Sequence, residues 1–153
     1  MKLDPDLCRS LLFVPAGNER YLESALRGTA DVIQIDLEDA IPHDAKDQAR
    51  EDAKADIDRI HARKRVGVVR INHEPQIFTS DLDAVVRPGL AGLTIPKVSC
   101  AEDLRRVDQM VSAIEQEHNY PVGDVRLIAQ IESAAGVLNV REIAQATPRL
   151  AAM

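Results

Sequence analysis

The chain has 153 residues, enough to bury one hydrophobic core, and we expect a single domain over residues 1–153. Its 25 acidic and 19 basic side chains give a net charge of −6, and only 3% of the residues are aromatic, so we expect no nucleic-acid partner. No apolar run has the length of a signal-peptide core or a membrane span, so we predict a soluble, cytoplasmic protein with no membrane partner.

Five short apolar runs recur along the chain at the spacing of βα units, and a sixth begins at its end. Nearly continuous runs of Val, Ile and Leu are typical of strands that are covered on both faces, so we predict a parallel sheet. The predicted strands are residues 11–14, 32–37, 66–71, 93–95 and 127–131, with the sixth starting within 149–153.

Helical segments with recognisable start signals lie between these runs. The clearest has apolar residues at helical spacing from Leu104 to Ile114. The predicted helices are 19–27 between Asn18 and Gly28, a helix capped by Asp44 that includes Ile57 and Ile60, a short helix that starts at Ser80 and Asp83 and ends before Pro88, a helix from a capping box of Ser99 and Glu102 to about His118, and a last helix over about 134–145.

Alternating strands and helices are compatible with two architectures, an open doubly wound sheet and a closed barrel. A closed (β/α)8 barrel needs about 250 residues, and this chain carries five to six units. We therefore expect either an open sheet or the first part of a barrel.

Several familiar kinds of site have no support in the sequence. The turn at residues 15–18 joins a strand to a helix but has neither a GxGxxG pattern nor a P-loop lysine, so an ordinary turn is the better interpretation. His43 and His73 have no partner at metal-ligand spacing, and neither do Cys8 and Cys100. Without a Gly-x-Ser-x-Gly segment, acyl-enzyme chemistry is not expected.

Charged residues follow most of the predicted strands, and the carboxyl ends of parallel strands share the edge where sites form. Glu132 follows the fifth strand, where a carboxylate is either half of a Mg²⁺ site or a partner for the dipole of the next helix. Arg70 ends the third strand, and it either clamps a substrate carboxylate or pairs with the acidic residues within 36–39. Both alternatives remain open for each residue.

Two further residues stand near the same edge. Lys97 follows the fourth strand and has the chemistry for a Schiff base, although an ion pair or a surface position is the commoner outcome for a lysine. Phe13, in the first strand, either lines the floor of a pocket or is an ordinary core residue.

The ordered set of strand-end motifs resembles the citrate lyase beta-subunit family, within the HpcH/HpaI aldolase superfamily. Each motif alone is weak, but together they follow one another at fitting spacing along essentially the whole chain. The motifs are RSLLFVP at residues 9–15, DLEDA at 36–40, RIN at 70–72, IPKV at 95–98 and QIESAAGVLN at 130–139.

The resemblance implies a (β/α)8 TIM barrel, here only its first five to six units, that makes or cleaves a carbon–carbon bond next to a 2-oxo or 2-hydroxy acid. It also implies that Arg70 binds the acid and is catalytic together with Glu38, and that Glu132 contacts substrate and holds Mg²⁺. By the same resemblance Phe13 packs against substrate, and Arg20, in the first strand-to-helix turn, approaches a CoA phosphate. The implied partners are a small acid such as oxaloacetate or pyruvate, an acyl-CoA, and other copies of the chain in a homo-oligomer.

The sequence departs from the family pattern in one respect. The family's second metal ligand is an aspartate after the sixth strand, and this sequence stops at Met153 before such a residue. The alternative to a Mg²⁺-dependent lyase is therefore a catalytically incompetent relative that binds a small acid or associates with itself.

Overall fold

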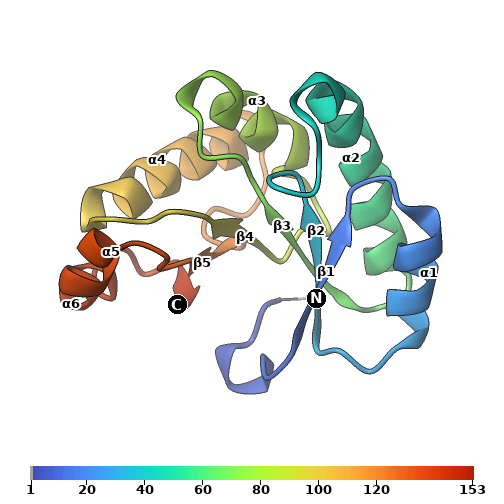
Figure 1. Cartoon of the computed structure of the whole chain (residues 1–153), viewed down its shortest axis with the longest axis horizontal. Helices are drawn as coiled ribbons and strands as arrows, with labels where there is room; N and C mark the ends of the chain where they lie inside the picture. Colours follow the sequence, from blue (N-terminus) through green and yellow to red (C-terminus); the bar gives the residue numbers. More distant parts are fainter. Residues whose placement is uncertain (1) are drawn as a thin grey trace.

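The computed structural model describes residues 2–153 as a wholly parallel six-stranded sheet with helices around it (Figure 1). The strands lie side by side in chain order, and each pairs with the next. They are β1 (Leu11–Pro15), β2 (Val32–Asp36), β3 (Val66–Arg70), β4 (Gly92–Ile95), β5 (Arg126–Ala129) and β6 (Leu150–Ala152).

This strand order decides between the two architectures. In a doubly wound sheet the order reverses at a switch point, whereas in a (β/α)8 barrel every strand is added on the same side. Within residues 2–153 the outer strands β1 and β6 do not pair with each other, so the sheet is open. The chain therefore forms part of a barrel, which confirms the prediction.

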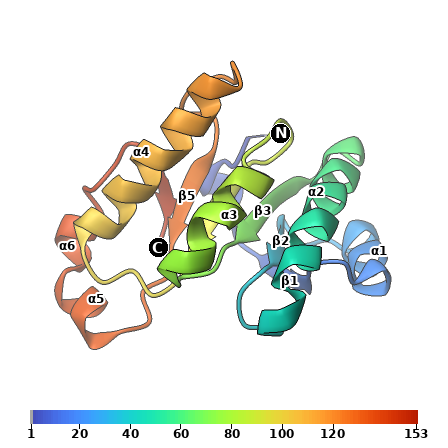
Figure 2. The same cartoon turned by 90° about the horizontal axis from the view of Figure 1, so that it is seen from above.

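The helices connect consecutive strands, and Figure 2 shows α1 to α4 following one another around the outside of the sheet. They are α1 (Glu19–Arg27), α2 (Lys46–Ala62), α3 (Pro75–Val85), α4 (Ala101–Glu117), α5 (Ala134–Leu138) and α6 (Val140–Ile143), with short 3-10 turns at Pro5–Leu7 and His43–Ala45. Across the described residues 2–153, no helix combines the length and apolar content that crossing a membrane would require.

Helix α1 begins and ends as the sequence predicts. The side chain of Asn18 accepts a hydrogen bond of 3.1 Å from the backbone N–H of Tyr21, and Gly28 follows the last residue. Helix α4 also ends as predicted, with His118 as its C-terminal cap.

Two predicted helix starts are wrong. Asp44 does not cap α2, because a 3-10 turn leads directly into the helix and its cap is Ala45, which makes no side-chain hydrogen bond. Helix α3 begins at Pro75 rather than Ser80, since the fixed φ of proline suits the first position of a helix.

Two other predictions are partly right. The capping box of α4 lies one residue later than predicted: Cys100 is the cap, and Asp103 accepts hydrogen bonds from the backbone N–H groups of Ser99 and Cys100. The last predicted helix is in fact two short helices, α5 and α6, which meet at Asn139.

Apolar side chains pack on both faces of the sheet. The larger cluster lies between the sheet and the helices and includes Ile33 and Leu93, both fully buried. A smaller cluster covers part of the inner face and consists of Leu3, Val32, Val68, Ala91 and Ile128. The inner face is therefore apolar over one part and free to carry polar groups elsewhere.

A buried ion cluster fixes the last strand to α4. Arg149, which is 4% exposed, contacts Glu115 Oε2 through Nη2 at 2.6 Å and Asp108 Oδ1 through Nε at 2.5 Å. Its Nη1 donates to the carbonyl of Val125, and Glu115 also accepts from the backbone N–H of Gly123 at 2.8 Å. The cluster joins α4 to the segments that precede β5 and β6.

We expect Arg149→Met to destabilise the chain by about 3–5 kcal/mol, because it leaves the buried Glu115 carboxylate without its cation. Urea unfolding measures the loss. Arg105→Met is the matched control, since Arg105 is half exposed and makes only a 3.6 Å surface pair with Glu102. Equal losses in the two variants would contradict a structural role for the cluster.

Candidate functional site

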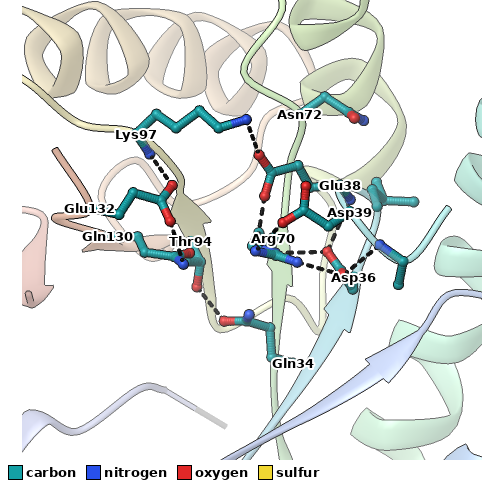
Figure 3. A network of polar contacts seen from close by, with 12 residues as sticks. Gln34, Asp36, Glu38, Asp39, Arg70, Asn72, Thr94, Lys97, Gln130 and Glu132 are labelled. Atoms are coloured by element: carbon teal, nitrogen blue, oxygen red, sulfur yellow. Dashed lines mark hydrogen bonds and ion pairs between the residues drawn. The ribbon is translucent and has the colours of Figure 1, made fainter. Parts of the chain in front are cut away.

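Charged side chains gather where the strands end, as Figure 3 shows. Asp36 ends β2 and Arg70 ends β3, and the two residues lie directly opposite each other in the strand register. Other charged residues come from the loops that follow β2, β4 and β5. Six residues form what we term the mouth: Asp36, Glu38, Asp39, Arg70, Lys97 and Glu132.

Arg70 is the most highly coordinated side chain of the mouth, and it is 7% exposed. Its Nε and Nη2 donate to the two carboxylate oxygens of Asp36 at 2.8 and 2.7 Å. Its Nη1 lies 2.9 Å from Glu38 Oε2 and 3.4 Å from Asp39 Oδ2. The ion pair considered from the sequence therefore forms, and it holds the guanidinium at the strand ends.

These contacts shift the pKa values of both partners. Burial alone would raise the pKa of Asp36, but hydrogen bonds from Arg70 and from the backbone N–H groups of Glu38 and Ala40 bring it below its ordinary value. The hydrogen bonds to Asp36 raise the pKa of Arg70. Both groups are therefore charged at neutral pH.

Glu38 lies between two cations. It is 5% exposed, and its Oε1 lies 2.9 Å from Lys97 Nζ, while its Oε2 faces Arg70. Neither oxygen has a hydrogen bond of regular geometry within residues 2–153. Ion pairing alone therefore balances this buried carboxylate.

Lys46 holds the backbone that carries Glu38, a role that the sequence analysis missed. Its Nζ donates to the carbonyl oxygens of Leu37 at 2.6 Å and Glu38 at 2.5 Å. Burial lowers the pKa of this lysine, which is only 8% exposed. Nothing in the sequence signals the role, because Lys46 stands in the first turn of a helix that is rich in charged residues.

Lys97 joins the two acidic sides of the mouth. Its backbone has a φ of 56°, and its N–H donates to Glu132 Oε1 at 2.8 Å while its side chain reaches Glu38. The close contact with the Glu38 carboxylate raises the pKa of the ammonium group. Of the alternatives drawn from the sequence, the ion pair is the one observed, and a protonated lysine is unsuited to forming a Schiff base.

Glu132 is exposed and lies at the other end of this chain of contacts. Its Oε2 accepts a 3.1 Å hydrogen bond from Gln130 Nε2. The cap of α5 is Ser133, whose Oγ accepts from the N–H of Gly136, so Glu132 does not cap the helix. Glu132 and Arg70 share the mouth and are connected through Lys97 and Glu38 rather than by direct contact.

The mouth supplies only part of a metal site. Among residues 2–153, no three His, Cys, Asp or Glu side chains are placed to hold a metal ion. Mg²⁺ needs only one or two protein carboxylates, because water and substrate oxygens complete its octahedron. Glu132 fits one such position, since it is exposed and no cationic side chain of residues 2–153 pairs with it, whereas Arg70 holds Asp36 and Glu38.

Phe13 lies beneath the mouth and is not an ordinary core residue. It is 48% exposed, and the guanidinium carbon of Arg70 lies 5.1 Å from the centre of its ring. The ring lines an open groove of about 610 Å³ on the inner face of the sheet. In the same groove Thr94 Oγ1 donates to Gln34 Oε1 at 2.5 Å, and Gln34 Nε2 has no partner within residues 2–153.

Arg20 and the two histidines considered from the sequence take no part in the mouth contacts. Arg20 is exposed in the first turn of α1, one residue after the start of the helix that the sequence predicts. His43 is exposed in a 3-10 turn. His73 is exposed in the loop between β3 and α3.

The mouth has a net negative charge. Its four carboxylates face two cations, Arg70 and Lys97, which leaves a net charge of −2 on these six groups. Such a site attracts a divalent cation and repels a free dicarboxylate. A bound divalent cation would bring the net charge of these groups and the metal to zero, so that an organic acid could then approach without net repulsion.

Comparisons with known proteins point to one family. Residues 9–153 match the family model described as HpcH/HpaI aldolase/citrate lyase. The chain is similar to citrate lyase subunit beta of Leuconostoc mesenteroides subsp. cremoris, with 34% identity over 145 residues that cover 94% of this chain and 48% of that protein. It is also similar to an L-malyl-CoA/beta-methylmalyl-CoA lyase of Cereibacter sphaeroides, with 38% identity, covering 97% of this chain and 47% of that one.

Solved structures resemble the chain in the same way. RipC from Yersinia pestis aligns with a TM-score of 0.71 and 31% identity, over 96% of this chain and 57% of its own. CitE from Mycobacterium tuberculosis, in complex with magnesium and acetoacetate, aligns with a TM-score of 0.64 and 27% identity, over 94% of this chain and 53% of its own. The chain spans about half the length of the curated relatives it matches.

Removing the arginine of the mouth should change how stability depends on pH. The lowered pKa of Asp36 stabilises the fold above its unfolded pKa, near 3.9, and this contribution is lost as the pH falls through the folded pKa. In Arg70→Met, burial without the cation favours protonated Asp36. We therefore expect a loss of about 3–5 kcal/mol at pH 7 that narrows as the pH falls toward about 4 and below.

Urea unfolding at several pH values between 3 and 7 measures this difference. Arg141→Met, which removes an exposed arginine of α6, is the control and should follow the unsubstituted chain at every pH. A loss in Arg70→Met that stays constant over the pH range would contradict the coupling to Asp36.

Proposed function

We propose that this chain, which belongs to the HpcH/HpaI aldolase/citrate lyase family, carries the acid-binding part of a Mg²⁺-dependent carbon–carbon lyase site. The substrate would be a 2-hydroxy acid or its acyl-CoA, similar to citryl-CoA or malyl-CoA, and the products a keto acid and an acyl-CoA. The observation that carries the proposal is the mouth itself, where Arg70 and Glu132 stand at one sheet edge and are linked through Glu38 and Lys97.

Arg70 would bind the acid through donors that its ion pairs leave open. Nη2 has a single hydrogen bond to Asp36, so its second N–H is available within residues 2–153. The contact between Nη1 and Asp39 is long, at 3.4 Å, and the Asp39 side chain is 74% exposed. A substrate carboxylate can therefore take the place of Asp39, while Asp36 and Glu38 keep the guanidinium in position.

The same donors suit the chemistry of carbon–carbon cleavage. Retro-aldol cleavage moves negative charge onto an enolate oxygen, and a donor fixed beforehand at that oxygen lowers the barrier without reorganisation. Glu132 would hold Mg²⁺, which, when bound, supplies Lewis-acid stabilisation of the same charge. Phe13 would contact the carbon skeleton of the acid, because its exposed ring lies directly below Arg70.

The charge of the mouth supports joint binding of metal and acid. Because the six groups have a net charge of −2, we expect neither pyruvate nor oxaloacetate alone to bind well. The Mycobacterium tuberculosis CitE structures hold magnesium together with acetoacetate or pyruvate. We propose the same pairing for this chain.

The test is a set of melting curves with MgCl₂, pyruvate or oxaloacetate, and both together. We expect a stabilisation that needs metal and acid together and reaches about 2.7 kcal/mol at 100 times the dissociation constant. Glu132→Gln should abolish the joint effect, whereas Glu142→Gln, an exposed position on α6, should retain it.

A shift with acid alone, or one that survives Glu132→Gln, would contradict the proposed metal and acid site. Release of keto acid from malyl-CoA or citryl-CoA then measures the lyase step separately. Joint stabilisation without any release would favour the alternative, a chain that binds the acid without catalysis.

A further inference from the structure

A small pocket lies beside the mouth, between α3 and α4. It has a volume of about 70 Å³ and includes Phe78, Arg106 and His73 in its lining. Asn72 and Lys97 also line it, and Figure 3 shows the same two residues bordering the mouth. The pocket is therefore contiguous with the mouth on the side that faces α3 and α4.

The charged groups around this pocket differ in how far they are already paired. The Lys97 ammonium is paired with a carboxylate of the mouth, which leaves Arg106 as the lining cation without a carboxylate partner within residues 2–153. The acidic group in the lining is Asp103, whose Oδ2 accepts hydrogen bonds from the backbone N–H groups of Ser99 and Cys100, in addition to the Ser99 hydroxyl. Because the helix cap already uses this carboxylate, it does not neutralise Arg106 through an ion pair.

Arg106 is the distinctive group of the lining. Its guanidinium carbon lies 5.8 Å from the centre of the Phe78 ring, and Phe78 is buried. No ion pair within residues 2–153 involves Arg106, whereas its neighbour Arg105 pairs with Glu102. A guanidinium that is supported by an aromatic face and has no carboxylate partner suits recognition of an anion.

We propose that this pocket binds one anionic group, a phosphate or a carboxylate, at Arg106. A cavity needs roughly 10–15 Å³ of such space to hold one water molecule. The pocket therefore has room for a group of about phosphate size but not for an aromatic ring. If the proposed function holds, the anionic group at Arg106 belongs to the substrate molecule whose acid end lies at Arg70.

Nuclear magnetic resonance titration of the isotopically labelled chain tests anion binding without Mg²⁺. Sodium phosphate and sodium acetate are the two probes. We expect saturable chemical-shift changes in the backbone amides of residues 72–73, 97 and 103–107. Arg106→Gln should raise the dissociation constant about tenfold, because it removes a charge-assisted contact. Arg105→Gln, which replaces the adjacent exposed arginine, should leave the dissociation constant unchanged.

The two probes separate the sources of the anion. Tighter binding of phosphate than of acetate would assign the pocket to a phosphorylated substrate, and the reverse order would assign it to a second carboxylate. Arg20→Gln should leave the shifts of residues 103–107 unchanged, since Arg20 lies on α1.

The proposal is overturned if neither anion shifts these amides in a saturable way, or if Arg106→Gln binds both anions as tightly as the unsubstituted chain does. Failure of joint binding by MgCl₂ and pyruvate would remove only the proposed lyase function. Phosphate or acetate binding at Arg106 does not depend on that result, so the two failures can be told apart.

Discussion

The two parallel hydrogen bonds between Arg70 and Asp36 hold together the ends of two neighbouring strands. The pair is almost completely buried, with side chains 8% and 3% exposed. Burying two charges is costly, and in proteins it is tolerated when the geometry is good and further hydrogen bonds satisfy the remaining atoms. Asp36 meets this condition, because backbone N–H groups of Glu38 and Ala40 also donate to it. These hydrogen bonds fix the loop after β2, which carries Glu38 and Asp39, to the Arg70–Asp36 pair.

Lys97 connects this group of ion pairs to the opposite side of the mouth. A non-glycine residue in the left-handed region of φ carries a conformational cost of about 1–2 kcal/mol. Here that conformation directs the backbone N–H to Glu132, while the side chain reaches Glu38. Lys97 thus connects the exposed carboxylate of Glu132, which suits a metal ion, to the buried carboxylate of Glu38, which contacts Arg70. The cost is offset by contacts on both sides of the mouth.

The fold and the sheet edge where the charged residues of the candidate site gather could be predicted from the sequence, because both depend on repeating patterns. Apolar runs at βα spacing identify the strands, and the rule that carboxyl strand ends share an edge brings Arg70 and Glu132 together. Gln34 was missed, although a polar residue inside the apolar run VIQID was a usable signal. Lys46 had no such signal, since its role depends on which carbonyl groups the loop after β2 turns toward it. The caps of α2 and α3 also depended on turns that local residue preferences do not determine.

The inner face of the sheet explains how a site with so many charges coexists with a stable fold. One part of that face is closed by the apolar cluster around Val32 and Val68. Two residues further along β2 and β3, on the same face, stand Gln34 and Arg70, and the surface becomes polar. Apolar burial therefore anchors each strand close to the position where its polar residue emerges. The short separation between Val68 and Arg70 helps to keep the guanidinium in place against Asp36.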